Sequence, residues 1–148
     1  MQLSENFSLA EATASAAARA LGNDNQPTPA HLVNLRVTAG HMEVVRRILG
    51  NRAIDPTSWY RNPAVNAHVG GVSTSHHALG LAVDFRVRGL EGLAAARIIA
   101  ASDVQFDQLI WYRPTGILHL SFHPQMRRQV RTNPTTKAGA KLLKGLVP

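Results

Sequence analysis

Two histidines and one aspartate are the residues of this chain whose types and spacing could do chemistry. His77 and Asp84 lie seven positions apart, and His119 follows in a segment whose apolar residues alternate. Two imidazoles and one carboxylate are a ligand set that binds zinc and leaves one coordination position open. A zinc ion with an open position can activate water. The three residues therefore predict a Zn²⁺ site and favour a hydrolase.

The spacing of these residues indicates how the chain must support them. On one α-helix, His77 and Asp84 would be about 10 Å apart along the axis, too far for both to reach a zinc ion at ~2.0–2.2 Å. We expect instead a loop that folds back and places Asp84 at the start of a strand. His119 should point away from its apolar neighbours and toward the site. His76 competes with His77 for the ligand role, and the alternative is that all these histidines are separate surface or hydrogen-bonded residues.

The composition limits the class of protein. The 148 residues suffice for one domain, and the apolar fraction of 45% and charged fraction of 17% are ordinary for a globular protein. The chain has no cysteine, so a metal must be held by imidazole and carboxylate. No apolar run reaches the ~18 residues of a membrane span. Residues 1–7 lack the basic and apolar regions of a secretory signal.

The net charge of +7 is concentrated near the C-terminus. All nine acidic residues lie at or before Asp107, whereas the basic residues after position 125 are Arg127, Arg128, Arg131, Lys137, Lys141 and Lys144. We therefore predict a main domain over residues 1–125 and a basic tail over residues 126–148. After Pro134 the tail should be loosely held, with a weak helix over residues 137–143. Such a tail favours an anionic partner such as nucleic acid, anionic lipid or cell-wall polymer, or is a solvated end of the chain.

Two helices are predicted in the N-terminal third. Ser8 to Glu11 match a capping box, which opens an alanine-rich helix expected to end near Gly22. Thr28 and Pro29 fit the N-cap and first position of a second helix that runs to about Leu49. Both helices are more plausible as packing elements than as sites.

The rest of the chain is predicted to form short strands and helices. A short helix should begin at Asn62-Pro63 and end at Gly70-Gly71, and another should cover residues 90–101. The expected strands cover residues 53–55, 82–87, 108–112 and 117–122, the last two as a hairpin. Because helices come first and strands later, we predict an α+β fold. Its N-terminal helices would pack on a small, mainly antiparallel sheet that carries the zinc site.

The ten residues from Ser75 to Asp84 resemble a known signature. They match S-x-H-x-x-G-x-A-x-D, the zinc-binding signature of the zinc D-Ala-D-Ala carboxypeptidase family, at every defined position. That family includes phage L-alanyl-D-glutamate endopeptidases and the VanX-type dipeptidases. The resemblance is strongest to its short phage and bacterial members and covers residues 3–123. Further similar segments lie at residues 6–11, 34–35, 59–71, 106–110 and 119–122.

The resemblance implies roles for five residues. His77, Asp84 and His119 would bind zinc, and Arg61 and Ser75 would hold the substrate peptide. A guanidinium makes a two-pronged contact with a carboxylate, and peptidoglycan stem peptides carry free carboxylates. Arg61 could instead be a surface arginine ahead of a helix, and Ser75 could cap or brace the turn that carries His77.

The catalytic base is the point at which the chain departs from the family. Family members carry an acid or a histidine shortly before the last zinc ligand, where this chain has Gly116 and Ile117. In the short phage-like members a glutamate follows the preceding strand, and Tyr112 occupies that place here. A phenol is a poor base near neutral pH unless a metal or cation lowers its pKa. The other candidates for the base are His123, His76 and Asp107.

The resemblance implies a zinc-dependent peptidase that hydrolyses an amide bond in the stem or cross-link peptides of peptidoglycan. Such a protein would be made in the cytoplasm and act at the bacterial cell wall, after phage-type release or as a virion component. The alternative is a catalytically inactive, zinc-containing peptidoglycan-binding or virion structural module, because no base is evident. Nucleic-acid binding is disfavoured, since the basic segment has no aromatic residue on which bases could stack.

Overall fold

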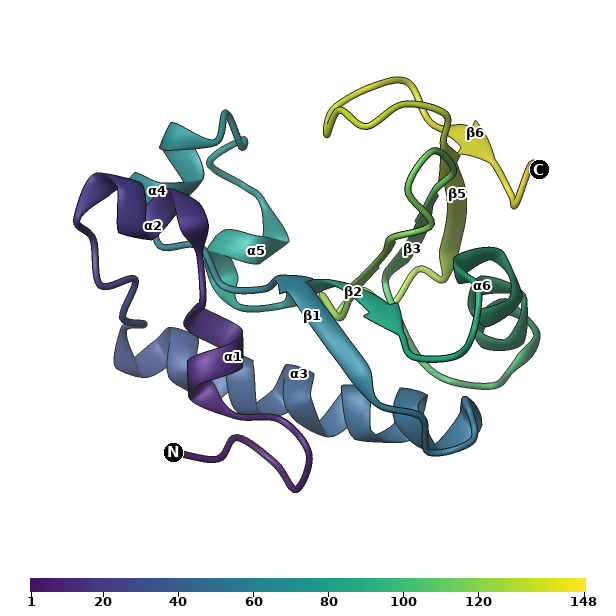
Figure 1. Ribbon diagram of the computed structural model, residues 1–148, viewed down its shortest axis with the longest axis horizontal. Coiled ribbons are helices and arrows are strands. Elements are labelled where there is room, and N and C mark those ends of the chain that lie inside the picture. The colour runs from purple at the N-terminus through teal and green to yellow at the C-terminus, as the bar shows by residue number, and fades with distance from the viewer.

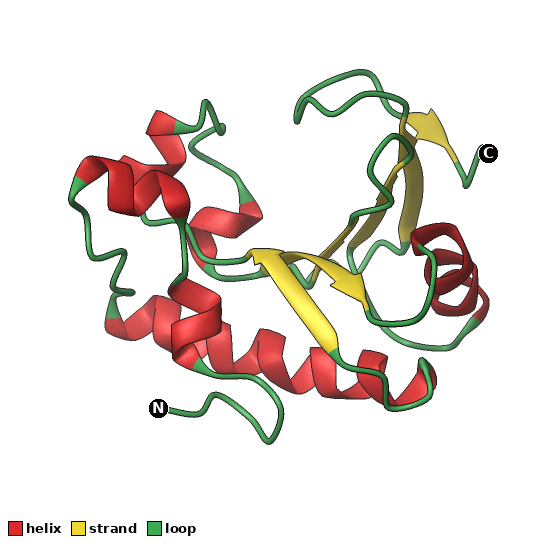
Figure 2. Cartoon of the chain, in the orientation of Figure 1, coloured by secondary structure: helices red, strands yellow, loops and turns green.

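A six-stranded sheet forms the centre of the computed structural model, which describes residues 1–148 (Figure 1, Figure 2). The strand order is β1-β2-β4-β3-β5-β6, and only the β3–β5 pair is parallel. The prediction of an α+β fold with a mainly antiparallel sheet is confirmed. The strands are β1 (Ile54–Ser58), β2 (Ala82–Val87), β3 (Gln108–Tyr112), β4 (Leu118–Ser121), β5 (Gln129–Asn133) and β6 (Leu143–Lys144).

Helices cover one face of this sheet and frame the other. The core lies between the sheet and the helices α3 and α6, where alternate residues of β2, β3 and β4 are buried. The opposite face of the sheet is left to the short helices α4 and α5 at one side (Figure 1). None of the helices is long and apolar enough to cross a membrane. The helices are α1 (Leu9–Thr13), α2 (Ala16–Leu21), α3 (Pro29–Ile48), α4 (Pro63–His68), α5 (His76–Leu79) and α6 (Gly92–Ala101).

The N-terminal helices begin as predicted, but the first is divided. The capping box at Ser8 is present, and Thr28 caps α3, which has Pro29 in its first turn. The single helix expected up to Gly22 is wrong, because the backbone is extended at Ala14 and Ser15. The Ser15 hydroxyl accepts a hydrogen bond from the backbone of Ala18 and so starts a new helix. A serine inside an alanine-rich run competes for backbone hydrogen bonds in this way.

The C-terminal segment differs most from the prediction. Residues 129–133 form β5 against β3, a strand that was not predicted. After Pro134, where a loose tail with a weak helix over residues 137–143 was expected, β6 pairs with β5. Val130 and Leu146 pack against the core, which gives the segment an apolar anchor. The division of the chain into a main domain over residues 1–125 and a basic tail over residues 126–148 stays a prediction.

Two of the six C-terminal cations are structural. Arg127 donates hydrogen bonds from its backbone and its guanidinium to the buried carboxylate of Asp107, at 2.8 to 3.1 Å. Arg128 donates to the carbonyls of Ala100, Ser102 and Val104 at the end of α6, and its guanidinium lies 4.5 Å from the centre of the Phe106 ring. These two arginines tie the C-terminal segment to the rest of the fold.

Candidate metal centre

The short helix α5 presents His77. The expected loop is therefore one helical turn, which Ser75 caps by accepting a hydrogen bond from the backbone of His77 at 3.3 Å. Gly80 ends the turn with φ of +78°, and the chain then enters β2. Asp84 is the third residue of β2 rather than its start. The reversal at Gly80 brings residues seven apart in sequence into contact.

The helix α3 holds this reversal in place. The Thr38 hydroxyl donates to the carbonyl of Gly80 at 2.7 Å, and the Asn34 amide donates to the carbonyl of Leu79 at 2.9 Å. A Cβ atom on Gly80 would lie 3.2 Å from the carbonyl oxygen of His31 and 3.2 Å from Leu35. Both the positive φ and the close approach of α3 therefore require glycine here.

A backbone carbonyl orients the His77 ring. Its Nδ1 atom lies 2.7 Å from the carbonyl oxygen of Trp59. A carbonyl can only accept, so Nδ1 carries the proton and Nε2 keeps its lone pair. Nε2 lies 3.3 Å from Oδ1 of Asp84. The hydrogen bond from Nδ1 to the Trp59 carbonyl is the usual support of a metal-binding histidine, since it fixes both the tautomer and the orientation of the ring.

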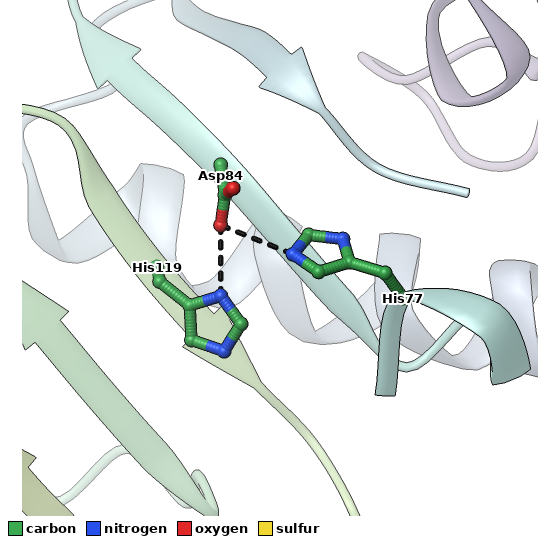
Figure 3. A group of neighbouring side chains, drawn as sticks. All are labelled: His77, Asp84 and His119. Carbon is green, nitrogen blue, oxygen red and sulfur yellow. Dashed lines mark hydrogen bonds and ion pairs between the residues drawn. The ribbon is translucent and has the colours of Figure 1, made fainter. Parts of the chain in front are cut away.

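Asp84 and His119 face each other from neighbouring strands. They are directly opposite in the β2–β4 register, and Nδ1 of His119 lies 2.8 Å from Oδ1 of Asp84. Figure 3 shows both imidazoles directed at the same carboxylate oxygen. One ligand atom from each of the three residues lies within 4.8 Å of the others. Ligand atoms held ~2.0–2.2 Å from one tetrahedral zinc ion lie roughly 3.4 Å apart, which is inside this 4.8 Å limit, so the group could hold a metal.

The electrostatics of Asp84 favour the charged form. Burial on its own raises the pKa of this carboxyl, but the neighbouring His77 and the hydrogen bond from His119 outweigh burial and leave the pKa below its ordinary value. Asp84 therefore stays ionised around neutral pH. A carboxylate must be deprotonated to bind a metal, so Asp84 is ready to act as a ligand.

The three residues lie in a cleft of about 330 Å³. Arg61, Ser75 and Tyr112 line the same cleft, as does His76. Residues 70–72 form part of one wall, and Ala138 and Gly139 form part of another. Two larger hollows, of about 470 and 530 Å³, lie at the start of α6 and beside the N-terminal loop, and neither contains His77, Asp84 or His119.

Arg61 is fixed by its backbone and leaves most of its guanidinium donors free. Its backbone N–H donates to the carbonyl of His77 at 3.2 Å, and Nη2 lies 3.5 Å from the Ser75 hydroxyl. Burial lowers the pKa of Arg61, whereas Asp84 and Tyr112 act in the opposite direction. Arg61 and Ser75 thus lie side by side at the cleft. Ser75 also caps α5, which is the alternative to substrate binding that its sequence position suggested.

The candidates for the catalytic base are not equally placed. Burial raises the pKa of Tyr112 above its ordinary value and Asp84 raises it further, while Arg61 and Asn133 act in the opposite direction. Asp107 is fully buried and bound by Arg127.

The two remaining histidines stack on each other. The rings of His76 and His123 have centres 5.0 Å apart and an interplanar angle of 20°. Of these two residues, only His76 is part of the cleft lining.

Sequence patterns did not indicate two further contributors to the site. The buried side chain of Asn25 donates to the carbonyls of Thr13 and Tyr60 and accepts from the backbone of Asn62, so it fixes both neighbours of Arg61. The carbonyl of Trp59 orients His77. The only signal for Asn25 was an asparagine in a polar loop, where its positive φ of 53° is tolerated.

Comparison with known proteins identifies the family. The peptidase M15 family matches residues 5–121 of this chain, which is most of its length. No match is found among curated proteins. Members of the family are metal-dependent, which agrees with a group of His77, Asp84 and His119 that could hold a metal. The chain therefore belongs to the peptidase M15 family, the zinc D-Ala-D-Ala carboxypeptidase and VanX-like family that its sequence resembles.

Proposed function

We propose that this protein is a zinc-dependent peptidase that hydrolyses an amide bond in the stem or cross-link peptides of peptidoglycan. The observation that carries the proposal is the convergence of His77 and His119 on one oxygen of Asp84, in a cleft that also contains Arg61. The family supports a peptide substrate. The resemblance to short phage members supports action at the bacterial cell wall, as an endolysin-like or virion-associated enzyme.

Three residues would hold the zinc ion: His77 through its Nε2 atom, Asp84 through its carboxylate and His119 through its imidazole. When bound, zinc supplies a Lewis acid that polarises the scissile carbonyl and lowers the pKa of water. Two imidazoles and a carboxylate, with no cysteine in the chain, are the donor set typical of catalytic zinc. The hydrogen bond to the Trp59 carbonyl keeps His77 in the required tautomer.

Arg61 and Ser75 would position the substrate. The free donors of the Arg61 guanidinium can form a two-pronged contact with a peptide carboxylate. The Ser75 hydroxyl, 3.5 Å from Nη2 of Arg61, adds a neighbouring polar contact. The Arg61 backbone N–H donates a hydrogen bond to the carbonyl of His77, so the fold fixes the distance between a carboxylate bound by Arg61 and the metal-binding residues.

Stabilisation of the developing charge is assigned to Tyr112, and proton transfer is assigned to His76. Because its pKa is raised, Tyr112 stays protonated near neutral pH and its hydroxyl can donate to the oxygen on which charge develops. Asp107 is bound by Arg127, and His123 is not part of the cleft lining. His76 is the remaining candidate that lines the cleft and can take a proton from the attacking water.

The test is digestion of isolated peptidoglycan with the zinc-loaded protein, followed by mass spectrometry of the released fragments. We expect new amino groups, abolished by a chelator and restored by zinc. His119→Ala should be inactive, and Arg97→Gln, on the exposed face of α6, should be as active as the wild type. Intact sacculi and intact synthetic stem peptides after incubation with zinc-loaded protein would reject the enzyme.

A catalytically inactive wall-binding or virion structural module is the second candidate. One observation favours it: Asp84 is the only carboxylate among the residues that line the cleft, so no glutamate or aspartate is available as a separate base. This candidate requires one bound zinc per chain and sedimentation with peptidoglycan, without release of any amino group. The digestion experiment separates the two candidates.

A further inference from the structure

The C-terminal strands β5 and β6 each carry one cation, Arg131 and Lys144, in the cross-strand row that contains Asp84 and His119. Asp84 lies opposite His119, and His119 lies opposite Ile110. On the other side of β3, Ile110 lies opposite Arg131, which lies opposite Lys144. Neighbouring strands are about 4.8 Å apart, so Arg131 and Lys144 lie about 10 and 14 Å from His119 along this line.

The cations are on the same face of the sheet as the cleft. The side chain of Gln129 lies 3.4 Å from that of Gln108, which lines the cleft, while Val130 packs against the core on the other face. Side chains alternate along a strand, so Arg131 returns to the cleft face. Lys144 is paired with Arg131 across β5 and β6 and shares its face.

No carboxylate of the chain neutralises these charges. The ion pairs of lysine and arginine side chains are Arg88 with Asp55 and Arg127 with Asp107. Arg131 has only a side-chain contact with the neighbouring carbonyl of Val130, at 2.9 Å. The positive charges of β5 and β6 are therefore free to bind an external anion.

A loop adds a third cation and closes this end of the cleft. Residues 134–142 connect β5 to β6, and Figure 1 shows this segment extending to the side on which α5 lies. The amide of Asn133 donates to the carbonyl of Lys137 at 2.9 Å, which fixes the loop. Ala138 and Gly139 line the cleft, and the Lys137 side chain is exposed beside them.

We propose that Arg131 and Lys144, with Lys137 on the loop, form a second carboxylate-binding subsite. It takes a carboxylate of the substrate peptide on the side of the metal site where β5 and β6 lie. An extended peptide advances about 3.3 Å per residue, so a span of about 10–14 Å places this carboxylate three or four residues from the bond that is cleaved. The subsite rests on the proposed function and adds a determinant outside residues 5–121, the part that matches the family.

The test is calorimetric binding of synthetic stem pentapeptides to the zinc-loaded protein, with the scissile amide N-methylated to prevent turnover. Matched peptides have one carboxylate at a time converted to a carboxamide. For the wild type, amidation of the carboxylate that lies three or four residues from the scissile amide (the distal amidation) should raise Kd about tenfold. For the double variant Arg131→Gln/Lys144→Gln, the same amidation should change Kd less than about twofold, because the contact is already lost.

Two controls separate this contact from folding and from net charge. Arg131→Lys keeps the charge and should restore most of the sensitivity to amidation. Arg97→Gln removes an exposed charge from α6, on the opposite face of the sheet, and should behave as the wild type. Equal thermal unfolding of the variants confirms that they are folded.

The possible outcomes distinguish the subsite from the function. If the wild type binds the peptides but no distal amidation affects Kd more than in the double variant, the subsite is rejected and the proposed function stands. If the wild type binds none of the peptides, both are rejected. If the double variant loses only its retention on an anionic polymer column, the cations serve a polyanion and the subsite is rejected.

Discussion

Asp84 and His119 occupy directly opposite positions on the antiparallel strands β2 and β4, with Oδ1 and Nδ1 2.8 Å apart. The backbone pairing that sets this distance involves no metal. His77 is held independently, by α5 and by the carbonyl of Trp59. The fold itself therefore brings His77, Asp84 and His119 together.

Removal of metal should consequently leave the fold intact. We expect the chelated protein to keep its far-ultraviolet circular dichroism spectrum, because the core between the sheet and α3 and α6 does not involve the ligands. Added zinc should raise the unfolding midpoint, since zinc binds only the folded state, with about 2.7 kcal/mol of stabilisation at a hundredfold excess over Kd. A chelated protein that unfolds would show instead that the site organises the chain.

Gly80→Ala should weaken both stability and zinc binding. The substitution places a Cβ at a positive φ and 3.2 Å from the His31 carbonyl, so the turn that carries His77 must shift. We expect a loss of about 1–3 kcal/mol in chemical denaturation, together with a higher Kd for zinc. Gly89→Ala is the matched control, since Gly89 also has a positive φ but nothing within 4 Å of the added Cβ. Equal zinc affinity in the two variants would contradict this account of Gly80.

Tyr112→Phe should reduce turnover without reducing zinc content. The raised pKa keeps the hydroxyl protonated, so its contribution is a hydrogen bond to the developing charge. We expect kcat to fall about a hundredfold with little change in KM, measured on a synthetic stem peptide. Unchanged kcat in this variant would remove Tyr112 from the reaction.

The pairing of Asp107 with Arg127 predicts a specific dependence of stability on pH. The hydrogen bonds from Arg127 hold the pKa of Asp107 below its ordinary value. The stabilisation is therefore complete above the ordinary carboxyl pKa of about 4 and is lost as the pH falls through the lowered pKa of the folded state. Asp107→Asn should lower the unfolding midpoint on the order of 5 °C at pH 7, and the difference from the wild type should shrink below about pH 4.

Asp55→Asn provides the comparison for this measurement. Asp55 also pairs with an arginine, but the side chains of Asp55 and Arg88 are 44% and 71% exposed, so the pair is screened by solvent. Little change in unfolding midpoint is expected for this variant at any pH. A difference between Asp107→Asn and the wild type that is the same at pH 3 and pH 7 would show that the charge of Asp107 is not the cause.

The convergence of His77, Asp84 and His119 was predictable because its signals are local. The alternation around His119 gave the face to which its side chain points, and the small residues between His77 and Asp84 indicated a reversal. The choice between His76 and His77 was not predictable from spacing. It depends on the Trp59 carbonyl, which reaches the ring from eighteen residues upstream.

The C-terminal segment was predicted poorly because its contacts are distant and its sequence is polar. Val130 is the only apolar residue of β5, and β5 pairs with β3 in parallel, so no tight turn between the two strands marks the pair in the sequence. Arginines that bind the end of α6 and the carboxylate of Asp107 could not be separated by sequence from arginines that face solvent. The division of the first helix had the same origin, since one serine hydroxyl decided it.

The metal site is tested most directly by the zinc content of the purified protein, measured by mass spectrometry of metals alongside the variants His77→Ala, Asp84→Ala and His119→Ala. We expect one zinc per chain in the wild type and its loss in each variant, with His76→Ala retaining the metal. A wild type that binds no zinc, or variants that keep it, would contradict the assignment of these three residues as the metal site.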